Sequence, residues 1–348
     1  MLQELRGLPT SLTELDVSHC PLDKGIPEEI GSLLALEYLV LSGSKIRFLP
    51  ETISRLPRLK SLILHDCDMF QELPRLPTSL AMLTFSSKSL RAVPNLAVLT
   101  NITQLKLSDG IDCTKDYEGE HLELSGLGSL EKLKRLDLRP SRMITFNRAS
   151  ELGSLSKLET LDLSFPDMAS ISELPSCLRM LTLRHLRTAI PWERYSNLML
   201  LTELKLMDFT LTDIDFGGLD SLPSLTTLSI GPSESLLRVS NLGRLRAITS
   251  LWIHWCEELM EIPGLEQLER LERLNIRLCG SICGIQDLLG LNRLKMMEIW
   301  CCSSWLCVPR MIDQCRLHIS RCGKLPSFDG TYSEYGRMGK PTGDVSRE

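Results

Sequence analysis

Long hydrophobic runs are missing from this chain of 348 residues. A membrane-spanning helix requires about 20 consecutive apolar residues, and no stretch of the sequence approaches that length. The first six residues, Met1 to Arg6, also lack the apolar core of a secretory signal. We therefore predict a protein without a membrane partner that stays in the cytosol, with the nucleus as the alternative.

An excess of positive charge is also absent. The chain has 39 Lys and Arg residues against 44 Asp and Glu residues, which gives a net charge of −5, and its basic residues are scattered along the sequence. Nucleic-acid binding depends on grouped basic side chains that neutralise phosphates. The composition therefore argues against nucleic acid as a partner.

Motifs of catalysis are missing as well. The sequence contains no phosphate-binding loop, no His-Glu-x-x-His zinc motif, no Gly-x-Ser-x-Gly nucleophile turn and no calcium loop. We therefore predict that the chain is not an enzyme and that it has no catalytic residue, no metal ligand and no cofactor.

What the sequence does contain is one phrase, Leu-x-x-Leu-x-Leu, which recurs through most of its length. A degenerate fourteenth copy runs through Leu317 and Ile319, with Gln314 in place of the first leucine, and ends at Cys322. Apart from one gap, successive starts are 20 to 25 residues apart, which is the period of leucine-rich repeats. The thirteen clear copies start at Leu12, Leu36, Leu59, Leu80, Ile102, Leu133, Leu158, Leu178, Leu201, Leu225, Ile248, Leu271 and Leu294.

The alternation within each copy predicts a short strand. In the first copy, Leu15 and Val17 fall on one side, and the polar residues between them fall on the other. Prolines 13 to 15 residues after many starts disfavour long helices in the return segments, and an Ile/Leu spacing of three after them favours short 3-10 turns. The fold class is therefore predicted to be an α/β solenoid. It is a leucine-rich-repeat horseshoe with a parallel β-sheet on the concave face and a mostly irregular or 3-10 convex side.

The repeats predict one domain over residues 1–322, with about 14 repeats, and a polar tail at 323–348 that is partly disordered. The single gap, between Ile102 and Leu133, holds an acidic insertion near residues 108–122 that reads as an exposed loop. No cap precedes Leu12 beyond a partial repeat, so we expect that something N-terminal is missing or that another chain covers this end.

The cysteines have a shared phase. Six of them fall eight residues after a repeat start, where a small and readily buried thiol suits an inward turn between neighbouring repeats. Because four of the six occur in consecutive repeats, a metal string and a disulfide pair are alternatives to a structural role, although no Cys-x-x-Cys pair occurs. The six structural turn positions are Cys20, Cys67, Cys256, Cys279, Cys302 and Cys322.

The outward strand positions, two, four and six residues after each start, predict the binding surface. In the eleventh to thirteenth repeats they carry tryptophan and arginine, residue types that are enriched at binding hot spots. The alternative is that Trp252 and Trp300 stack over Asn275 and Arg277 and only shield the sheet. The predicted protein-binding residues are Trp252, His254, Trp255, Arg273, Asn275, Arg277, Glu298 and Trp300.

The phrase Leu-x-x-Leu-x-Leu-x-x-Cys, as in Leu59 to Cys67, resembles the leucine-rich repeats of plant intracellular immune receptors. The Leu-Pro connectors at Leu8–Leu12, Leu76–Leu80 and Leu174–Leu178 look like those of receptors that carry a Toll-type signalling domain and a nucleotide-binding domain. This resemblance implies a disease-resistance module that recognises a pathogen effector or a guarded host protein and contributes to autoinhibition. Neither a signalling domain nor a phosphate-binding loop is present in the sequence, so a nucleotide-binding domain would be a partner outside this chain.

Other classes of repeat protein remain open at this point. A general intracellular scaffold in signalling predicts a constitutive partner. A fragment of a bacterial repeat-bearing ubiquitin ligase has similar Leu-Pro connectors, but it requires a large helical catalytic domain, and none follows Cys322. The absent signal sequence makes an extracellular receptor a poorer fit.

Overall fold

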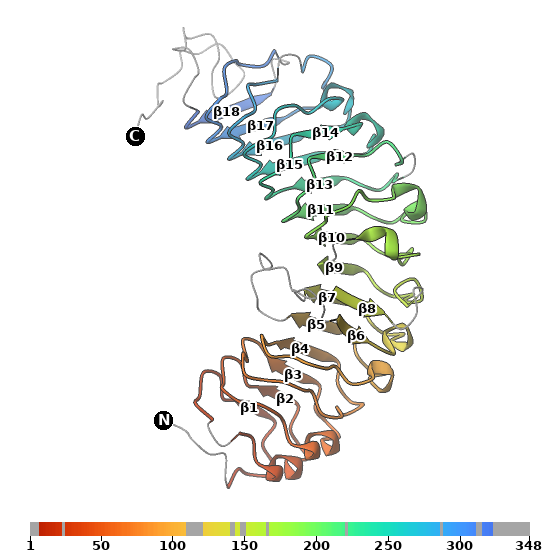
Figure 1. Cartoon of the computed structure of the whole chain (residues 1–348), viewed down its shortest axis with the longest axis vertical. Helices are drawn as coiled ribbons and strands as arrows, with labels where there is room; N and C mark the ends of the chain where they lie inside the picture. Colours follow the sequence, from red (N-terminus) through yellow and green to blue (C-terminus); the bar gives the residue numbers. More distant parts are fainter. Residues whose placement is uncertain are drawn as a thin grey trace. The chain divides into compact units, whose positions relative to one another are not determined.

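The computed structural model describes residues 7–22, 25–108, 121–139, 143–146, 151–164, 167–219, 222–285, 288–310 and 315–322 (Figure 1). Most of the predicted acidic insertion, Gln314 and the predicted tail at 323–348 lie outside these residues. The chain divides into two compact units. Unit 1 comprises Met1–Phe165 with Ser170–Leu178, and unit 2 comprises Pro166–Ala169 with Arg179–Glu348.

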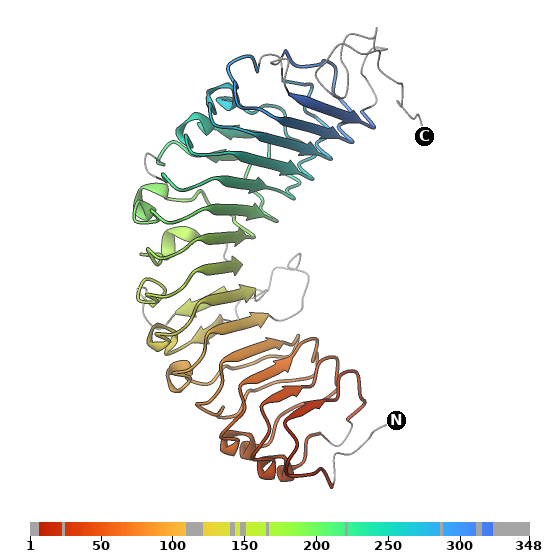
Figure 2. The same cartoon turned by 180° about the vertical axis from the view of Figure 1, so that it is seen from behind.

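Unit 1 contains a parallel sheet whose strands follow the order of the repeats (Figure 2). Each strand pairs with the strand of the next repeat in matched register, as in Leu15 with Leu39 and Leu39 with Leu62. The remaining neighbours pair in the same way. The strands are β1 (Glu14–Asp16), β2 (Tyr38–Val40), β3 (Ser61–Leu64), β4 (Met82–Ser86), β5 (Gln104–Ser108), β7 (Arg135–Arg139) and β9 (Thr160–Ser164).

Unit 2 repeats this arrangement. Its main sheet is again parallel and ordered by repeat, with Leu251 paired with Leu274 and Leu274 with Met297. The strands are β10 (Met180–Arg184), β11 (Glu203–Met207), β13 (Thr227–Ile230), β15 (Ser250–His254), β16 (Arg273–Arg277), β17 (Met296–Trp300) and β18 (Arg316–Ser320). All fourteen predicted repeats therefore form a strand two residues after their start.

The leucines of the repeats form the core of each unit. Leu62 and Leu136 in unit 1 and Leu274 in unit 2 are at most 1% exposed. Burying one such side chain stabilises the fold by roughly 1.5–3 kcal/mol, so a single repeat cannot offset the entropy of ordering its own backbone. Stability therefore comes from stacking, because each leucine completes its contacts against the next repeat.

The return segments are short and tight, as predicted. Ile30, Leu33 and Leu36 keep the predicted spacing of three, and all are buried. Among the described residues the helices are all of the 3-10 type, and three of them follow a proline. They are η1 (Glu28–Ser32), η2 (Glu51–Arg55), η3 (Leu96–Val98), η4 (Leu127–Ser129), η5 (Met168–Ser170), η6 (Trp192–Tyr195), η7 (Leu242–Arg244) and η8 (Leu265–Gln267). The predicted solenoid class, with a parallel sheet and 3-10 return segments, is thus confirmed.

Two small parallel sheets in the return segments were not predicted. In unit 1, β6 (His121–Leu124) pairs with β8 (Met143–Phe146). In unit 2, β12 (Asp213–Asp215) pairs with β14 (Arg238–Ser240). Each pair joins the return segments of two neighbouring repeats. These segments are therefore linked by strand pairing, as the repeat strands are in the main sheet.

A left-handed turn ends most strands at the seventh position after the repeat start. There the backbone φ lies between 51° and 57° although the residues are not glycine, which costs about 1 kcal/mol each. The turn carries a main-chain hydrogen bond to the next repeat, as from Trp255 N to the carbonyl oxygen of Arg277 at 2.9 Å. The residues with this conformation are His19, Asp66, His185, Asp208, Trp255, Leu278, Cys301 and Arg321.

Candidate functional site

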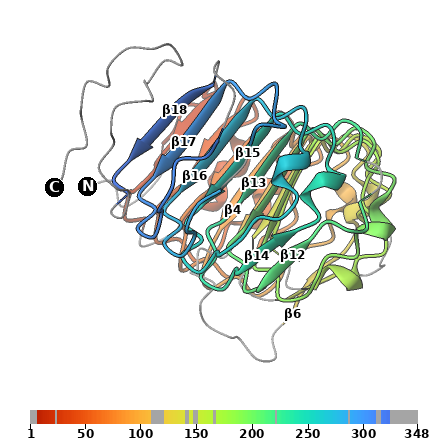
Figure 3. The same cartoon turned by 90° about the horizontal axis from the view of Figure 1, so that it is seen from above.

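The open face of the last four strands brings the predicted binding residues together. We call this surface the β15–β18 face; it comprises the outward side chains of these strands and the turn residues that follow them. Figure 3 shows the four strands side by side and pointing the same way. The register forms columns, so that Trp252, Asn275, Glu298 and His318 are neighbours in turn, and His254, Arg277 and Trp300 form the next column.

Glu298 is the centre of the polar contacts on this face. Its Oε2 accepts a hydrogen bond from Asn275 Nδ2 and an ion-paired one from the Arg277 guanidinium at 2.7 Å. Asn275 is only 5% exposed, which is less than its outward position predicted. Its amide therefore helps to hold Glu298 in place rather than offering a free hydrogen-bonding group to a partner.

The three predicted tryptophans differ in exposure. Trp252 is 38% exposed and Trp255 is 55% exposed. Trp300 is half-buried, and the guanidinium of Arg321 lies 5.7 Å from the centre of its ring, within the range of a cation–π contact. Arg277, which together with Asn275 lies between the two tryptophans of the shielding alternative, is ion-paired with Glu298 at 2.7 Å. Trp252 and Trp255 therefore present apolar surface to solvent.

Arginines surround the tryptophans. Arg273 is exposed, and its Nε donates a hydrogen bond to Ser250 Oγ at 3.3 Å. Sequence reasoning missed Arg316 and Arg321, which are both exposed on the same face. Both belong to the degenerate fourteenth copy. The phase of the repeats gives their outward positions, but the pattern of this copy is too weak to single out its side chains.

His254 is the titratable residue of this face with a shifted pKa. Burial lowers the pKa of its imidazole below the ordinary range, and the charge of Arg277 acts in the same direction. The carboxylate of Asp208 opposes this shift, but it is also engaged with the Arg184 guanidinium at 3.0 Å. His254 is therefore neutral at neutral pH, and the positive charge of the face comes from its arginines.

The predicted turn cysteines are free thiols, and most of them are buried. Cys67, Cys256, Cys279 and Cys302 have no exposed surface, whereas Cys20 and Cys322 are half-buried. The Cys279 thiol lies 3.3 Å from the carbonyl oxygen of Arg277 in its own repeat and 3.9 Å from that of Ile253 in the preceding one. Thiols at this position therefore contact main-chain oxygens at the ends of the strands, both in their own repeat and in the preceding one.

Serines, which were not among the residues predicted for this turn, occupy the same turn in other repeats. Ser233 Oγ donates to the carbonyl oxygen of Phe209 at 2.9 Å, and Ser87 Oγ donates to that of Phe70 at 2.6 Å. Ser44 Oγ lies 3.7 Å from Cys67 Sγ, so hydroxyl and thiol share one column. The sequence does indicate this role, because Ser44 and Ser233 lie eight residues after a repeat start, as the turn cysteines do.

The two final thiols of the column differ in acidity. The neighbouring Cys302 thiol lowers the pKa of Cys322 to about 7, and the pKa of Cys302 itself is raised. We predict that iodoacetamide labels Cys322 in the folded protein with a midpoint near pH 7, because only the thiolate reacts. Mass spectrometry of protein labelled between about pH 5 and pH 9 measures this midpoint.

The matched control for this labelling is Cys302→Ala, which removes the neighbouring thiol. We expect the midpoint of Cys322 to rise towards the ordinary cysteine value of about 8.5. A wild-type midpoint already at that value would contradict the lowered pKa of Cys322.

No metal or membrane site is visible among the residues that the structure describes. The described cysteines are all free thiols, and no three His, Cys, Asp or Glu side chains in that part of the chain are grouped to hold a metal ion. Nor is any helix there long and apolar enough to cross a membrane.

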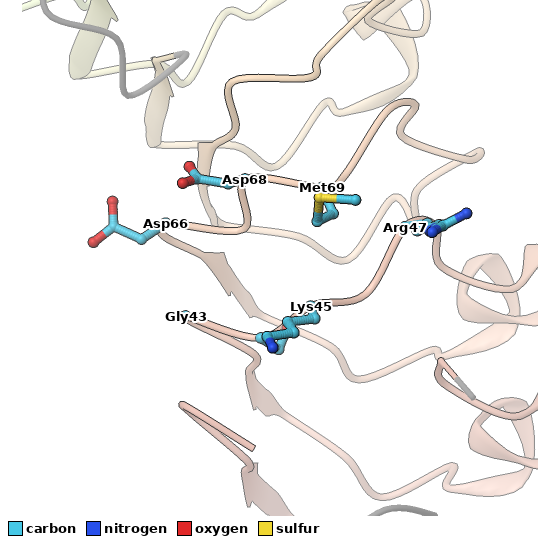
Figure 4. Close-up of a pocket in the computed structure, with 7 residues that line it drawn as sticks. Gly43, Lys45, Arg47, Asp66, Asp68 and Met69 are labelled. Carbon is cyan, nitrogen blue, oxygen red and sulfur yellow. The ribbon is translucent and has the colours of Figure 1, made fainter. Parts of the chain in front are cut away.

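Unit 1 contains an open cavity of about 640 Å³ between its second and third repeats (Figure 4). Its charged residues do not converge, because Asp66 and Arg47 extend in opposite directions. The carboxylates on its wall are also engaged elsewhere, Asp68 with Lys88 at 2.7 Å and Asp66 with His65 at 2.9 Å. The arrangement offers no cluster of groups aimed at one ligand.

Comparisons with known sequences agree with this architecture. A family model described as a leucine-rich repeat region matches residues 10–241. The chain is 48% identical over 71 residues to TMV resistance protein N of Nicotiana glutinosa and 44% identical over 72 residues to disease resistance-like protein DSC1 of Arabidopsis thaliana. These matches cover 20% and 21% of the chain and only 6% of each relative. The predicted resemblance to plant disease-resistance proteins is confirmed over these segments.

Solved structures share the fold at low sequence identity. An internalin, inlF of Listeria monocytogenes, aligns over 91% of this chain and 87% of its own, with a TM-score of 0.55 and 18% identity. TLR13, solved as a complex with ssRNA13, aligns over 92% of this chain and 54% of its own, with a TM-score of 0.51 and 18% identity. At this level of identity the likeness establishes the fold alone.

Proposed function

We infer the function of this chain from the family to which it belongs, the leucine-rich-repeat proteins. It is a protein-binding module, and its relatives point to a plant disease-resistance receptor as its setting. It recognises a pathogen effector or a guarded host protein, contributes to autoinhibition in the cytosol, and works with a nucleotide-binding domain outside this chain. Binding rather than catalysis is its contribution.

One observation carries this proposal, namely the composition of the β15–β18 face. Two tryptophans remain exposed on a rigid sheet, and arginines lie beside them. Tryptophan and arginine dominate the energetics of protein interfaces, because they combine a large apolar area with directed hydrogen bonds.

The test is the combined substitution Trp252→Ala, Arg277→Ala and Trp300→Ala. We expect the affinity for the protein that co-purifies with the chain from infected leaf tissue to fall by at least about 100-fold, because the variant removes two or more hot-spot side chains. Titration calorimetry or surface binding measures the affinity, and circular dichroism checks that the fold is intact.

The matched control is a triple alanine variant on the open face of unit 1, at Tyr38, Lys106 and Arg135. It should bind within about twofold of the wild type, since scattered outward residues are rarely hot spots. Unchanged affinity of the first variant would reject the β15–β18 face as the site. Recovery of the same partner from uninfected tissue would favour a general signalling scaffold.

A further inference from the structure

The β15–β18 face carries a concentration of positive charge that the whole sequence does not reveal. The chain has a net charge of −5, yet this face has four exposed arginines against one outward carboxylate. The arginines are Arg273, Arg277, Arg316 and Arg321, and the carboxylate is Glu298. With His254 neutral, the face is electropositive on a molecule that is otherwise acidic.

The one carboxylate does not cancel this charge. Glu298 is held by both Asn275 and Arg277, so it is committed within the face. Of the remaining arginines, Arg273 and Arg316 lie in one column of the sheet with Met296 between them. Two strand spacings separate them, which corresponds to roughly 10 Å.

Apolar surface lies within reach of these charges. Trp252 is in the repeat before Arg273, and the residue is 38% exposed. The exposed Trp255 follows at the end of the same strand. An extended peptide in the polyproline II conformation has three residues per turn and rises about 3.1 Å per residue, so carboxylates three residues apart lie on the same side, roughly 9 Å apart, and match the two arginines.

We propose that the β15–β18 face binds an acidic, extended segment of the partner protein, with carboxylates three residues apart on Arg273 and Arg316 and an apolar side chain on Trp252. This inference rests on the proposed function and names the chemistry of its partner. Charge complementarity favours the acidic peptide, and the guanidinium fork pairs with a carboxylate through two parallel hydrogen bonds.

Single-stranded nucleic acid is the competing ligand, because arginine and tryptophan also bind phosphates and bases. Glu298 weighs against it, because a nucleic acid carries a phosphate at every nucleotide and would place charges opposite this carboxylate, whereas a peptide can place its carboxylates at Arg273 and Arg316 alone.

The experiment uses the full chain and a displayed library of random 12-residue peptides, selected at low salt and then resynthesised. We expect the recovered peptides to be enriched in Asp and Glu at a spacing of three, with an aromatic or aliphatic residue nearby. Arg273→Glu combined with Arg316→Glu should weaken their binding by at least about tenfold, because two attractive pairs become repulsive.

The control combines Arg246→Glu and Arg293→Glu, two exposed arginines of the return segments in the same unit, and makes the same change in net charge. This control variant should change the affinity for the peptides by less than about threefold. Its charges lie in the return segments, away from the β15–β18 face, and salt screens their effect on the peptide. Equal loss in both variants would show that net charge alone attracts the peptides and would overturn the proposal.

Two further outcomes separate this inference from the function on which it rests. Recovered peptides without acidic enrichment that still lose binding in the triple alanine variant would overturn the acidic partner and leave the site standing. Peptides that bind the triple alanine variant as well as the wild type would overturn both. A twelve-nucleotide poly-dT strand serves as a competitor against a labelled peptide. If it displaces that peptide at a lower concentration than the same peptide does in unlabelled form, nucleic acid is the ligand.

Discussion

Gly231→Ala is expected to lower the free energy of unfolding of unit 2 by about 2–6 kcal/mol. An alanine Cβ at this position would lie 1.8 Å from the carbonyl oxygen of His254 and 3.0 Å from Cys256 Sγ. The first contact is with backbone, so rotation of a side chain cannot relieve it. The φ of 106° adds a conformation that side chains with a Cβ rarely adopt.

The expected damage extends to the binding face. Gly231 follows β13, and its N–H donates to the carbonyl oxygen of Leu206 at 2.9 Å. A shift at this point moves the end of β15, where His254 and Trp255 lie. Hydrogen exchange should therefore accelerate in β13 and β15 before it does so in more distant strands.

Gly290→Ala is the matched control in the same unit. Its Cβ would meet the nearest atom, the carbonyl oxygen of Glu266, at 3.4 Å, and its φ lies outside the left-handed region. The free energy of unfolding should change by less than about 1 kcal/mol. Equal stability of the two variants would contradict the close approach of β15 to Gly231.

Trp305→Ala is expected to lower the free energy of unfolding by about 3–5 kcal/mol, the range for deleting a large buried aromatic side chain. Trp305 has no exposed surface, and it lies in the return segment after β17. Its indole Nε1 also donates a hydrogen bond of 2.5 Å to the carbonyl oxygen of Cys307. The variant loses both the packing and this donor.

Trp252→Ala provides the contrast, because the same residue type is removed from an exposed strand position. It should cost less than about 1 kcal/mol of stability, while it contributes to the loss of binding in the triple variant. Urea unfolding followed by circular dichroism compares the two. A stability loss of similar size in both would mean that Trp252 packs as a core residue and would weaken the case for the β15–β18 face.

The strands and their inward leucines could be predicted from the sequence because one phrase repeats with a constant phase. A single Leu-x-x-Leu-x-Leu is a weak signal, but thirteen clear copies fix which side of every strand is apolar. The 3-10 return segments followed from proline and from the spacing of Ile30, Leu33 and Leu36. These features depend on local chemistry that is the same in each repeat.

The side-chain contacts of the candidate site could be predicted only in part. The outward columns placed Trp252, Arg273 and Glu298 on one face, but the burial of Asn275 depends on contacts with the neighbouring strand that no single repeat encodes. Arg321 reaches Trp300 from a left-handed turn, and that conformation is not evident from an arginine in the sequence. The small sheet of β12 and β14 likewise arises from two segments with little repeat pattern of their own.

The order of the strands also has a consequence for how the protein is made. Each strand pairs with the strand one repeat later, as Glu14 does with Tyr38 and Arg273 with Met296. The loops that must close are therefore all short, and the entropy of closing each one is similar. A repeat can find its neighbour soon after that neighbour leaves the ribosome, so folding can keep pace with synthesis without waiting for distant segments.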